Sequence, residues 1–203
     1  MPSDPILDMR GVVKTFPGVR ALDGVDFAVR RGEVHALMGE NGAGKSTLIK
    51  VLTGVYPPDA GEIVFDGQPL RVRSPIEAQE HGISTIYQEV NLIPYLSVAE
   101  NIFLGRQPRG CLGRIAWRTL RAEAHALLEG LGLQLDVSLP LASYPVAIQQ
   151  MVAIVRAVSI RAKLLIMDEP TSSLDEDEVA RLFAIIRRLK ADGVSVVFIT
   201  HFL

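Results

Sequence analysis

The 203-residue sequence contains a single cysteine, Cys111, and four histidines without regular spacing. One cysteine excludes an internal disulfide and a cysteine-based metal cluster, and it is typical of a reducing compartment. The scattered histidines argue against a zinc site. A catalytic thiol is not indicated either, because Cys111 stands in a glycine-rich stretch with no base close by in the sequence.

The sequence also lacks an excess of basic residues. Its 21 Lys and Arg residues stand against 23 Asp and Glu residues, which gives a net charge of −2. A general nucleic-acid-binding protein usually has a strong basic excess, so the charge argues against that class. With 48% hydrophobic and 22% charged residues, the chain lies outside the disordered range and can bury a core.

No segment has the pattern of a secretory signal or a membrane span. The first ten residues contain an early acid and no apolar run. The longest run without a charge, 137–155, contains Pro140, Pro145 and two glutamines, which interrupt a helix or are costly in hydrocarbon. We therefore expect a soluble chain that can still sit on a membrane partner.

The chain changes character twice along its length. Apolar runs bounded by Gly, Pro and Asp predict strands over 7–16, 25–29, 34–38, 62–65, 83–87, 164–167 and 194–200. Helical spacing predicts helices over 45–53, 98–104, 118–131, 148–159 and 176–191. In the last of these helices an apolar stripe is formed by Val179, Leu182, Phe183, Ile186 and Leu189. Strands that alternate with helices predict a parallel sheet.

A phosphate-binding loop is predicted where the strand 34–38 meets the helix 45–53. The segment matches G-x-x-x-x-G-K-[ST] and consists of Gly39, Glu40, Asn41, Gly42, Ala43, Gly44, Lys45, Ser46 and Thr47. Glycines let successive backbone N–H groups turn toward a phosphate, and the helix N-terminus adds partial positive charge. We expect Lys45 to reach the β- and γ-phosphates of ATP and the Ser46 hydroxyl to bind Mg²⁺.

Two carboxylates follow the apolar strand 164–167. We expect Asp168 to hold Mg²⁺ and Glu169 to polarise the attacking water. Lys45 and Asp168 are too far apart in sequence for adjacent βαβ units, so an insertion is required, and the helical middle supplies it. Gln88 and His201 also directly follow predicted strands, and ligands of open α/β sheets bind at the carboxyl ends of strands. Each is an ordinary residue there when taken alone.

Together these segments resemble the nucleotide-binding domain of an ABC transporter. The resemblance rests on GENGAGKST, Gln88, LLIMDEPTSSLD and ITH, and it covers essentially the whole chain. A narrower resemblance, to the ATPase subunits of bacterial sugar importers, rests on FPGVRALDGVDFAVRRGEVHALMGENGAGKSTLIKVLTGVYPPDAGEI and IYQEVNLIPYLSVAENIFLGR. YPVAIQQMVAIVRAV and the closing THFL are most similar to subunits assigned to galactofuranose uptake.

The resemblance implies an α/β P-loop NTPase fold with a RecA-like core, a small antiparallel β subdomain and an inserted helical subdomain. It implies one ATP-binding domain over 1–203, cut before its final strands and helices, with the β subdomain and core over about 1–94, the helical subdomain over about 95–157 and core again over about 158–203. The chain then resembles the N-terminal one of two tandem domains.

The resemblance also implies roles for single residues. Phe16 matches the aromatic that stacks on adenine, although from the sequence it is equally a core aromatic. Gln88 is implied to sense Mg²⁺ and the water, the segment 173–175 to cross the dimer interface, and His201 to contact the γ-phosphate and hold Glu169. Glu169, His201, Lys45 and Gln88 form the implied catalytic set, and Ser46, Gln88 and Asp168 the implied Mg²⁺ ligands.

The family signature Leu-Ser-x-Gly-x-x-Gln departs from its pattern here. It reads Tyr144-Pro145-Val146-Ala147-Ile148-Gln149-Gln150, so Pro145 replaces the serine that contacts the γ-phosphate on the partner domain. We therefore expect the ATP site completed by this signature to be impaired, while the site on this chain's own loop keeps Glu169.

The implied function is ATP binding and hydrolysis that powers sugar import across a bacterial inner membrane, from a peripheral position on its cytoplasmic face. The implied partners are the second nucleotide-binding domain, the transmembrane permease subunits and, indirectly, a periplasmic sugar-binding protein, without nucleic acid. Two alternatives stay open: a soluble ABC-type ATPase acting on ribosomes or DNA, and a non-hydrolysing nucleotide switch.

A local run of basic residues lies beside Trp117 and consists of Arg106, Arg109, Arg114, Arg118 and Arg121. This run is either a solvated face or a contact with the permease or lipid headgroups.

Overall fold

The computed structural model describes residues 4–87, 92–172 and 174–200. Its internal contacts divide the chain into two compact units. Unit 1 contains residues 1–85, 162–169 and 189–203, and unit 2 contains residues 86–161 and 170–188. The boundaries at 94 and 157 that the sequence suggests for a helical subdomain stay a prediction.

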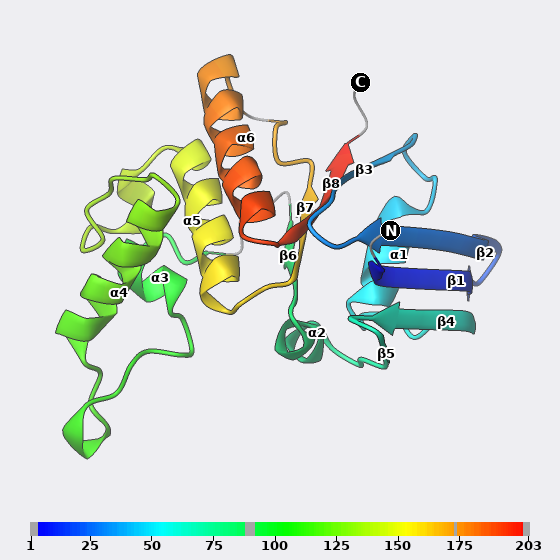
Figure 1. Ribbon diagram of the computed structural model, residues 1–203, viewed down its shortest axis with the longest axis horizontal. Coiled ribbons are helices and arrows are strands. Elements are labelled where there is room, and N and C mark those ends of the chain that lie inside the picture. The colour runs from blue at the N-terminus through cyan, green and yellow to red at the C-terminus, as the bar shows by residue number, and fades with distance from the viewer. Residues whose placement is uncertain (1–3, 88–91, 173, 201–203) are drawn as a thin grey trace. The chain divides into compact units, whose positions relative to one another are not determined.

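The strands of unit 1 form two sheets (Figure 1). The first is antiparallel in the order β2-β1-β4-β5, and the second has the order β3-β8-β7-β6, with β8 parallel to both β3 and β7. The bounds are β1 Pro5–Phe16, β2 Val19–Arg30, β3 Val34–Met38, β4 Ala60–Phe65, β5 Gln68–Pro69, β6 Ile83–Ile86, β7 Leu164–Asp168 and β8 Ser195–Thr200. The predicted parallel sheet is confirmed. The predicted strands are all present to within a few residues, except that β2 begins six residues before its predicted start.

One apolar core connects the two sheets of unit 1 with helix α1 (Lys45–Leu52). Met9 of β1, Leu52 of α1 and Leu164 of β7 are fully buried members of this core. Outside the core, Asp66 in the turn after β4 pairs with Arg31 before β3 and with Lys163 before β7. These two ion pairs hold the pKa of Asp66 below its ordinary value, mainly through the hydrogen bond from Lys163.

Unit 1 also contains a helix that the periodicity did not predict, α2 (Pro75–His81). Ser74 caps it by accepting a hydrogen bond from the Glu77 N–H, and Gly82 ends it in a left-handed conformation. Only Ala78 of this helix is buried, and Ile76 is exposed. The sequence of this helix contains capping residues but no repeating apolar positions, so hydrophobic periodicity could not predict it.

Unit 2 contains helices that pack on one another (Figure 1). α3 (Val98–Ile102) contacts both α4 (Trp117–Gly130) and α5 (Val146–Ser159). Most of α6 (Glu176–Ala191) also belongs to this unit, and short 3₁₀ turns occur at Cys111–Gly113 and Leu141–Ser143. In α6 the predicted stripe is largely confirmed: Leu182, Ile186 and Leu189 are buried, whereas Val179 and Phe183 are half-buried and Ile185 joins the buried set.

Candidate functional site

The loop from Gly39 to Gly44 connects the end of β3 to the start of α1, as the sequence predicts. Gly42 and Gly44 have φ angles of 87° and 88°, which side chains of L-residues rarely allow. At Gly44 there is no room for a side chain either, because a Cβ there would lie 2.7 Å from the carbonyl oxygen of Ala21 in β2. Gly44 therefore lets the loop rest directly on the β2 backbone.

Lys45 folds back over this loop. Its Nζ donates to the carbonyl oxygens of Gly39 at 2.5 Å and of Glu40 at 3.0 Å. Asn41, Gly42, Ala43 and Ser46 are exposed to solvent. An ammonium group and a glycine-rich loop at a helix N-terminus form a surface that suits phosphate oxygens.

The acidic pair lies at the end of β7. Asp168 is the last residue of β7 and pairs with Ile199 of β8, and the Glu169 N–H donates to the Ile199 carbonyl at 3.0 Å. Glu169 has a φ of 48°, a left-handed conformation that costs a non-glycine residue about 1–2 kcal/mol. Strain of this kind is found preferentially at functional sites.

Burial and the neighbouring Glu169 raise the pKa of Asp168, whereas the charges of Lys45 and Lys50 lower it. The loop and the acidic pair thus act on each other electrostatically within unit 1. In the sheet, β8 lies between β3 and β7, with Met38 paired to Thr200 and Asp168 to Ile199. The carboxyl ends of these three strands therefore converge, as the sequence predicts.

The residues at these strand ends fit a divalent cation. Ser46 offers an exposed hydroxyl in the first turn of α1, and Asp168 offers a half-buried carboxylate beside a second carboxylate. Oxygen ligands of this kind are those that Mg²⁺ prefers. A positive charge placed there would also offset the repulsion that raises the pKa of Asp168.

Phe16 lies at the end of β1 and is half-buried. Its ring meets that of Tyr56 edge to face, with centroids 5.1 Å apart and ring planes at 75°. The Lys14 ammonium lies over the Phe16 ring, 5.7 Å from its centroid. The aromatic predicted to contact a base is thus neither a core residue nor a free side chain.

The remaining predicted site residues are placed less completely. Gln88, Ser173 and His201 lie outside the described residues. The signature segment belongs to unit 2, where Pro145 precedes α5 as its N-cap and provides no side-chain hydrogen bond. Helix α5 begins at Val146, two residues before its predicted start, and the Gln149 Nε2 donates to the Tyr144 carbonyl at 2.9 Å.

The basic run of unit 2 is exposed over its whole length, as is Trp117. Arg106 differs from the other four arginines in its contacts: its Nη2 donates to the Ser159 hydroxyl at 2.9 Å and to the Ile102 carbonyl at 3.0 Å. A solvated face and a contact with the permease or lipid headgroups both stay predictions for this run.

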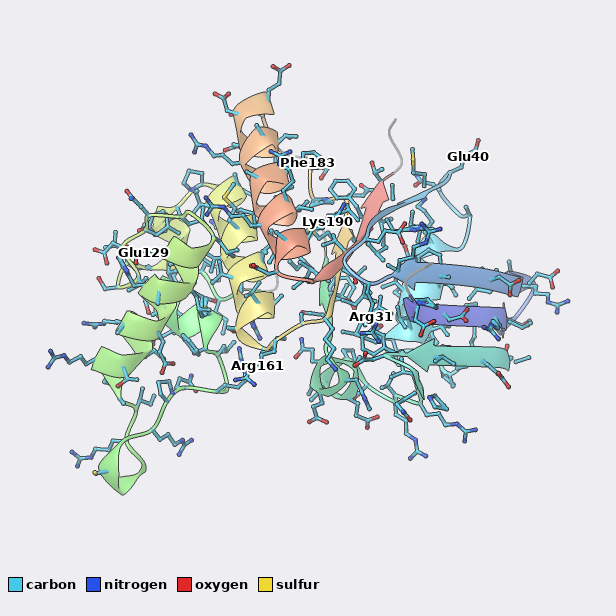
Figure 2. All side chains as sticks on the ribbon, viewed as in Figure 1. Arg31, Glu40, Glu129, Arg161, Phe183 and Lys190 are labelled. Carbon is cyan, nitrogen blue, oxygen red and sulfur yellow. The ribbon has the colours of Figure 1, made fainter. Side chains whose placement is uncertain are left out.

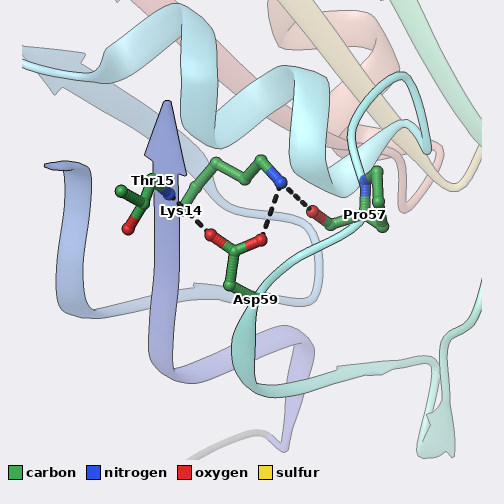
Figure 3. A network of polar contacts seen from close by, with 4 residues as sticks. All are labelled: Lys14, Thr15, Pro57 and Asp59. Atoms are coloured by element: carbon green, nitrogen blue, oxygen red, sulfur yellow. Dashed lines mark hydrogen bonds and ion pairs between the residues drawn. The ribbon is translucent and has the colours of Figure 1, made fainter. Parts of the chain in front are cut away.

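Three residues near the site escaped the sequence reasoning: Lys14, Tyr56 and Asp59. Lys14 lies two residues before Phe16 on β1, and Tyr56 contacts the Phe16 ring from forty residues further along the chain. Asp59 contacts Lys14 and Thr15 of the same strand from more than forty residues away (Figure 3). Lys50 also escaped it, although its charge acts on Asp168. None of the four belongs to a motif, so no signal in one sequence could have identified them.

The chain is similar to curated import proteins over almost its whole length. Ribose import ATP-binding protein RbsA 1 of Rubrobacter xylanophilus is 58% identical over 199 residues, which are 98% of this chain and 40% of that protein. Galactofuranose transporter ATP-binding protein YtfR of Escherichia coli O157:H7 is 53% identical over 198 residues, 98% of this chain and 39% of that protein. The chain thus spans about two fifths of the length of these relatives.

Solved structures show the same fold. The ADP conformation of MJ1267, an ATP-binding cassette of an ABC transporter, matches with a TM-score of 0.85 and 29% identity, over 99% of this chain and 83% of that one. A nucleotide-free ATP-binding cassette from an ABC transporter matches with a TM-score of 0.83 and 28% identity, over 98% and 82%. The predicted P-loop α/β fold is confirmed. Among the described helices, none is long and apolar enough to cross a bilayer.

A sequence profile described as ABC transporter matches residues 22–172, which contain both the phosphate-binding loop and the acidic pair. This match covers most of the chain and agrees with the relatives and the solved structures. The chain belongs to the ABC transporter family.

Proposed function

We propose that this chain is the N-terminal nucleotide-binding domain of two in tandem, and that it binds and hydrolyses ATP to energise a bacterial importer of monosaccharides. The observation that carries the proposal is the convergence of the Gly39–Gly44 loop and the Asp168–Glu169 pair at the ends of β3 and β7, the two strands that flank β8 in one sheet. Relatives named for ribose, fructose and galactofuranose match with 53–58% identity, so the proposal covers monosaccharides in general.

The residues of the site divide the work. The backbone amides of residues 39–47 bind the phosphates, and Lys45 exchanges its two loop carbonyls for β- and γ-phosphate oxygens, where it offsets the charge that develops. Phe16 stacks on the base. Glu169, held by the Ile199 carbonyl, orients the attacking water and accepts its proton.

Ser46 and Asp168 would hold Mg²⁺, which supplies electrostatic stabilisation of the phosphate oxygens when it is bound. Gln88 and His201 complete the proposed catalytic set, with Gln88 also a proposed Mg²⁺ ligand. Partners in the proposal are the second domain, the transmembrane permease subunits and, indirectly, a periplasmic binding protein. The chain then lies on the cytoplasmic face of the inner membrane as a peripheral subunit.

Single-turnover phosphate release from the full-length protein bound to its permease tests the proposal. We expect Glu169→Gln to bind ATP normally and to release phosphate at least about a hundredfold more slowly at this site. Glu80→Gln, an exposed glutamate of α2, is the control and should release phosphate at the wild-type rate. If the wild-type protein bound ATP but released no phosphate, the proposed hydrolysis would be wrong and the chain would act as a nucleotide switch.

A further inference from the structure

Asp59 fastens the strand segment that immediately precedes Phe16 (Figure 3). Its carboxylate accepts hydrogen bonds from the Thr15 N–H at 2.7 Å and from the Lys14 Nζ at 2.8 Å. Its own N–H donates to the Val13 carbonyl at 2.9 Å. One residue therefore contacts three consecutive residues of β1.

This stretch of β1 needs an external fastening. β1 pairs with β4 as far as Val13, which faces Ala60, the first residue of β4. Thr15 is two residues further along β1, past the end of this ladder, so its backbone N–H needs a partner outside the sheet. The Asp59 carboxylate provides that partner, so it fixes the backbone directly before Phe16.

Lys14 extends the fastening to the aromatic pair. Its side chain is almost fully buried, and its Nζ also donates to the Pro57 carbonyl at 2.8 Å. The same ammonium lies over the Phe16 ring. Residues two apart on a strand share a face, which places Lys14 and Phe16 on the same side of β1.

Tyr56 connects this arrangement to the phosphate-binding helix. Its N–H and that of Val55 both donate to the carbonyl of Lys50 in α1, at 3.1 and 2.9 Å. The Tyr56 ring then meets Phe16 edge to face, a geometry that aromatic pairs favour. Contacts within unit 1 thereby connect the Phe16 and Tyr56 rings to helix α1.

We propose that Asp59 is a positioning residue for base recognition, which acts through Lys14 and Thr15 to hold the Phe16 ring against Tyr56 in the orientation that receives the nucleotide base. The inference rests on the proposed function, because it takes Phe16 as the base-stacking residue. Affinity follows from preorganisation: a ring that is already fixed loses little freedom when a base stacks on it. The hydrogen bond from Lys14 keeps the pKa of Asp59 below its ordinary value, so the carboxylate is charged at neutral pH.

The test compares two ligands of the 203-residue chain by calorimetry in the presence of Mg²⁺: ATP, and inorganic triphosphate, which has no base. We expect Asp59→Ala, Lys14→Met and Tyr56→Leu each to weaken ATP binding about three- to tenfold and to leave triphosphate binding within about twofold, against about tenfold for Phe16→Ala. Tyr56→Phe keeps the ring contact and should restore ATP affinity. Asp8→Asn, which breaks an ion pair with Arg10 elsewhere on β1, is the matched control and should change neither affinity.

A double variant separates positioning from general stability. In the Phe16→Ala background, Asp59→Ala should cause no further loss of ATP affinity, because the ring on which it acts is gone. A full additional loss, or equal losses for ATP and triphosphate in the single variants, would overturn the inference while leaving the proposed function intact. Wild-type chain that binds neither ligand would overturn the proposed function, and the inference with it.

Discussion

At the scale of the single residue, position 44 requires glycine for two separate reasons. Its φ of 88° favours glycine, and the β2 backbone leaves no space for a Cβ. Most other turn glycines of unit 1 meet only the first demand. Gly67, for example, has a φ of 77° but no heavy atom within 4 Å of its Cβ position.

We therefore predict different outcomes for the same substitution at the two sites. Gly67→Ala should cost about 1 kcal/mol of stability, the price of the left-handed conformation, and leave ATP affinity unchanged. Gly44→Ala should cost about 2 kcal/mol or more and weaken ATP and triphosphate binding at least about tenfold, because the loop must move away from Ala21. Thermal melts and calorimetry measure both effects, and equal behaviour of the two variants would contradict the role given to Ala21.

Asp168 gives a second prediction at this scale. Burial and the charge of Glu169 raise its pKa, so the folded chain binds this proton more tightly than the unfolded chain does. The free energy of unfolding contributed by this group therefore falls as pH rises from the ordinary value of 3.8 through the raised value. Removing the charge should relieve the cost at neutral pH.

We expect Asp168→Asn to raise the Tm at pH 7 by a few degrees when Mg²⁺ is absent, and the gain should shrink as pH falls toward 4. Addition of Mg²⁺ should raise the Tm of the wild type and have little effect on the variant, so chelation reverses the order of the two. Asp136→Asn is the control: hydrogen bonds from Ser138 lower the pKa of Asp136, so this change should bring no gain. A Tm of Asp168→Asn below that of the wild type at neutral pH would contradict the argument.

At the scale of the element, α3 and the loop before it depend on one buried amide. Asn101 is fully buried, accepts from the Ile93 N–H at 2.7 Å and donates to the carbonyls of Ile93, Leu96 and Ser97 at 3.0–3.2 Å. Ser97 and Glu100 also form a reciprocal cap at the start of α3. The Asn101 side chain therefore shapes the loop together with backbone hydrogen bonds, which the Leu96 and Pro94 carbonyls accept from the N–H groups of Leu141 and Ala142.

We predict that Asn101→Ala destabilises the chain by about 3 kcal/mol, since several partly buried backbone groups lose the side chain that bonds them. Ser97→Ala removes only the cap and should cost about 1 kcal/mol. Chemical denaturation measures both. If the two losses were equal, Asn101 would matter only as part of α3 and not as the anchor of the loop.

The helices and strands differ in how well the sequence predicts them. Long amphipathic segments such as α5 and α6 were predicted to within two residues, because apolar spacing reports directly which face is buried. Helix α2 was missed, since its single buried residue, Ala78, leaves no period to detect. β2 begins six residues before its predicted start because its first half is held by pairing with β1, and its side chains there are mostly exposed.

The same contrast holds for the site. The loop and the acidic pair were predictable because each is contiguous in sequence and its chemistry requires fixed spacing. The fastening of Phe16 by Asp59 was not, because it depends on how β1 and the segment after α1 meet in space. Sequence thus identifies the groups that touch a ligand more readily than the groups that hold them.

At the scale of the whole molecule, Pro145 bears on how two nucleotide-binding domains cooperate. It precedes α5 without a hydroxyl, where the family signature has a serine. In the full-length protein with its permease, we predict that Pro145→Ser raises the steady-state ATPase rate severalfold and also stabilises the chain by about 1 kcal/mol as a helix N-cap. An unchanged ATPase rate, with ATP bound at both sites, would contradict the impairment assigned to this signature.

The central place of β8 in its sheet has a consequence for biosynthesis. β3, which leads into the phosphate-binding loop, pairs only with β8 in the described sheet, and β8 is the last strand of the described chain to be translated. On the ribosome β3 must therefore wait for nearly all the intervening residues, and closing so long a loop is slow. In a nascent chain that stalls before β8, the strands that carry the phosphate-binding loop and the acidic pair lack the strand that joins them, so the nucleotide site cannot assemble.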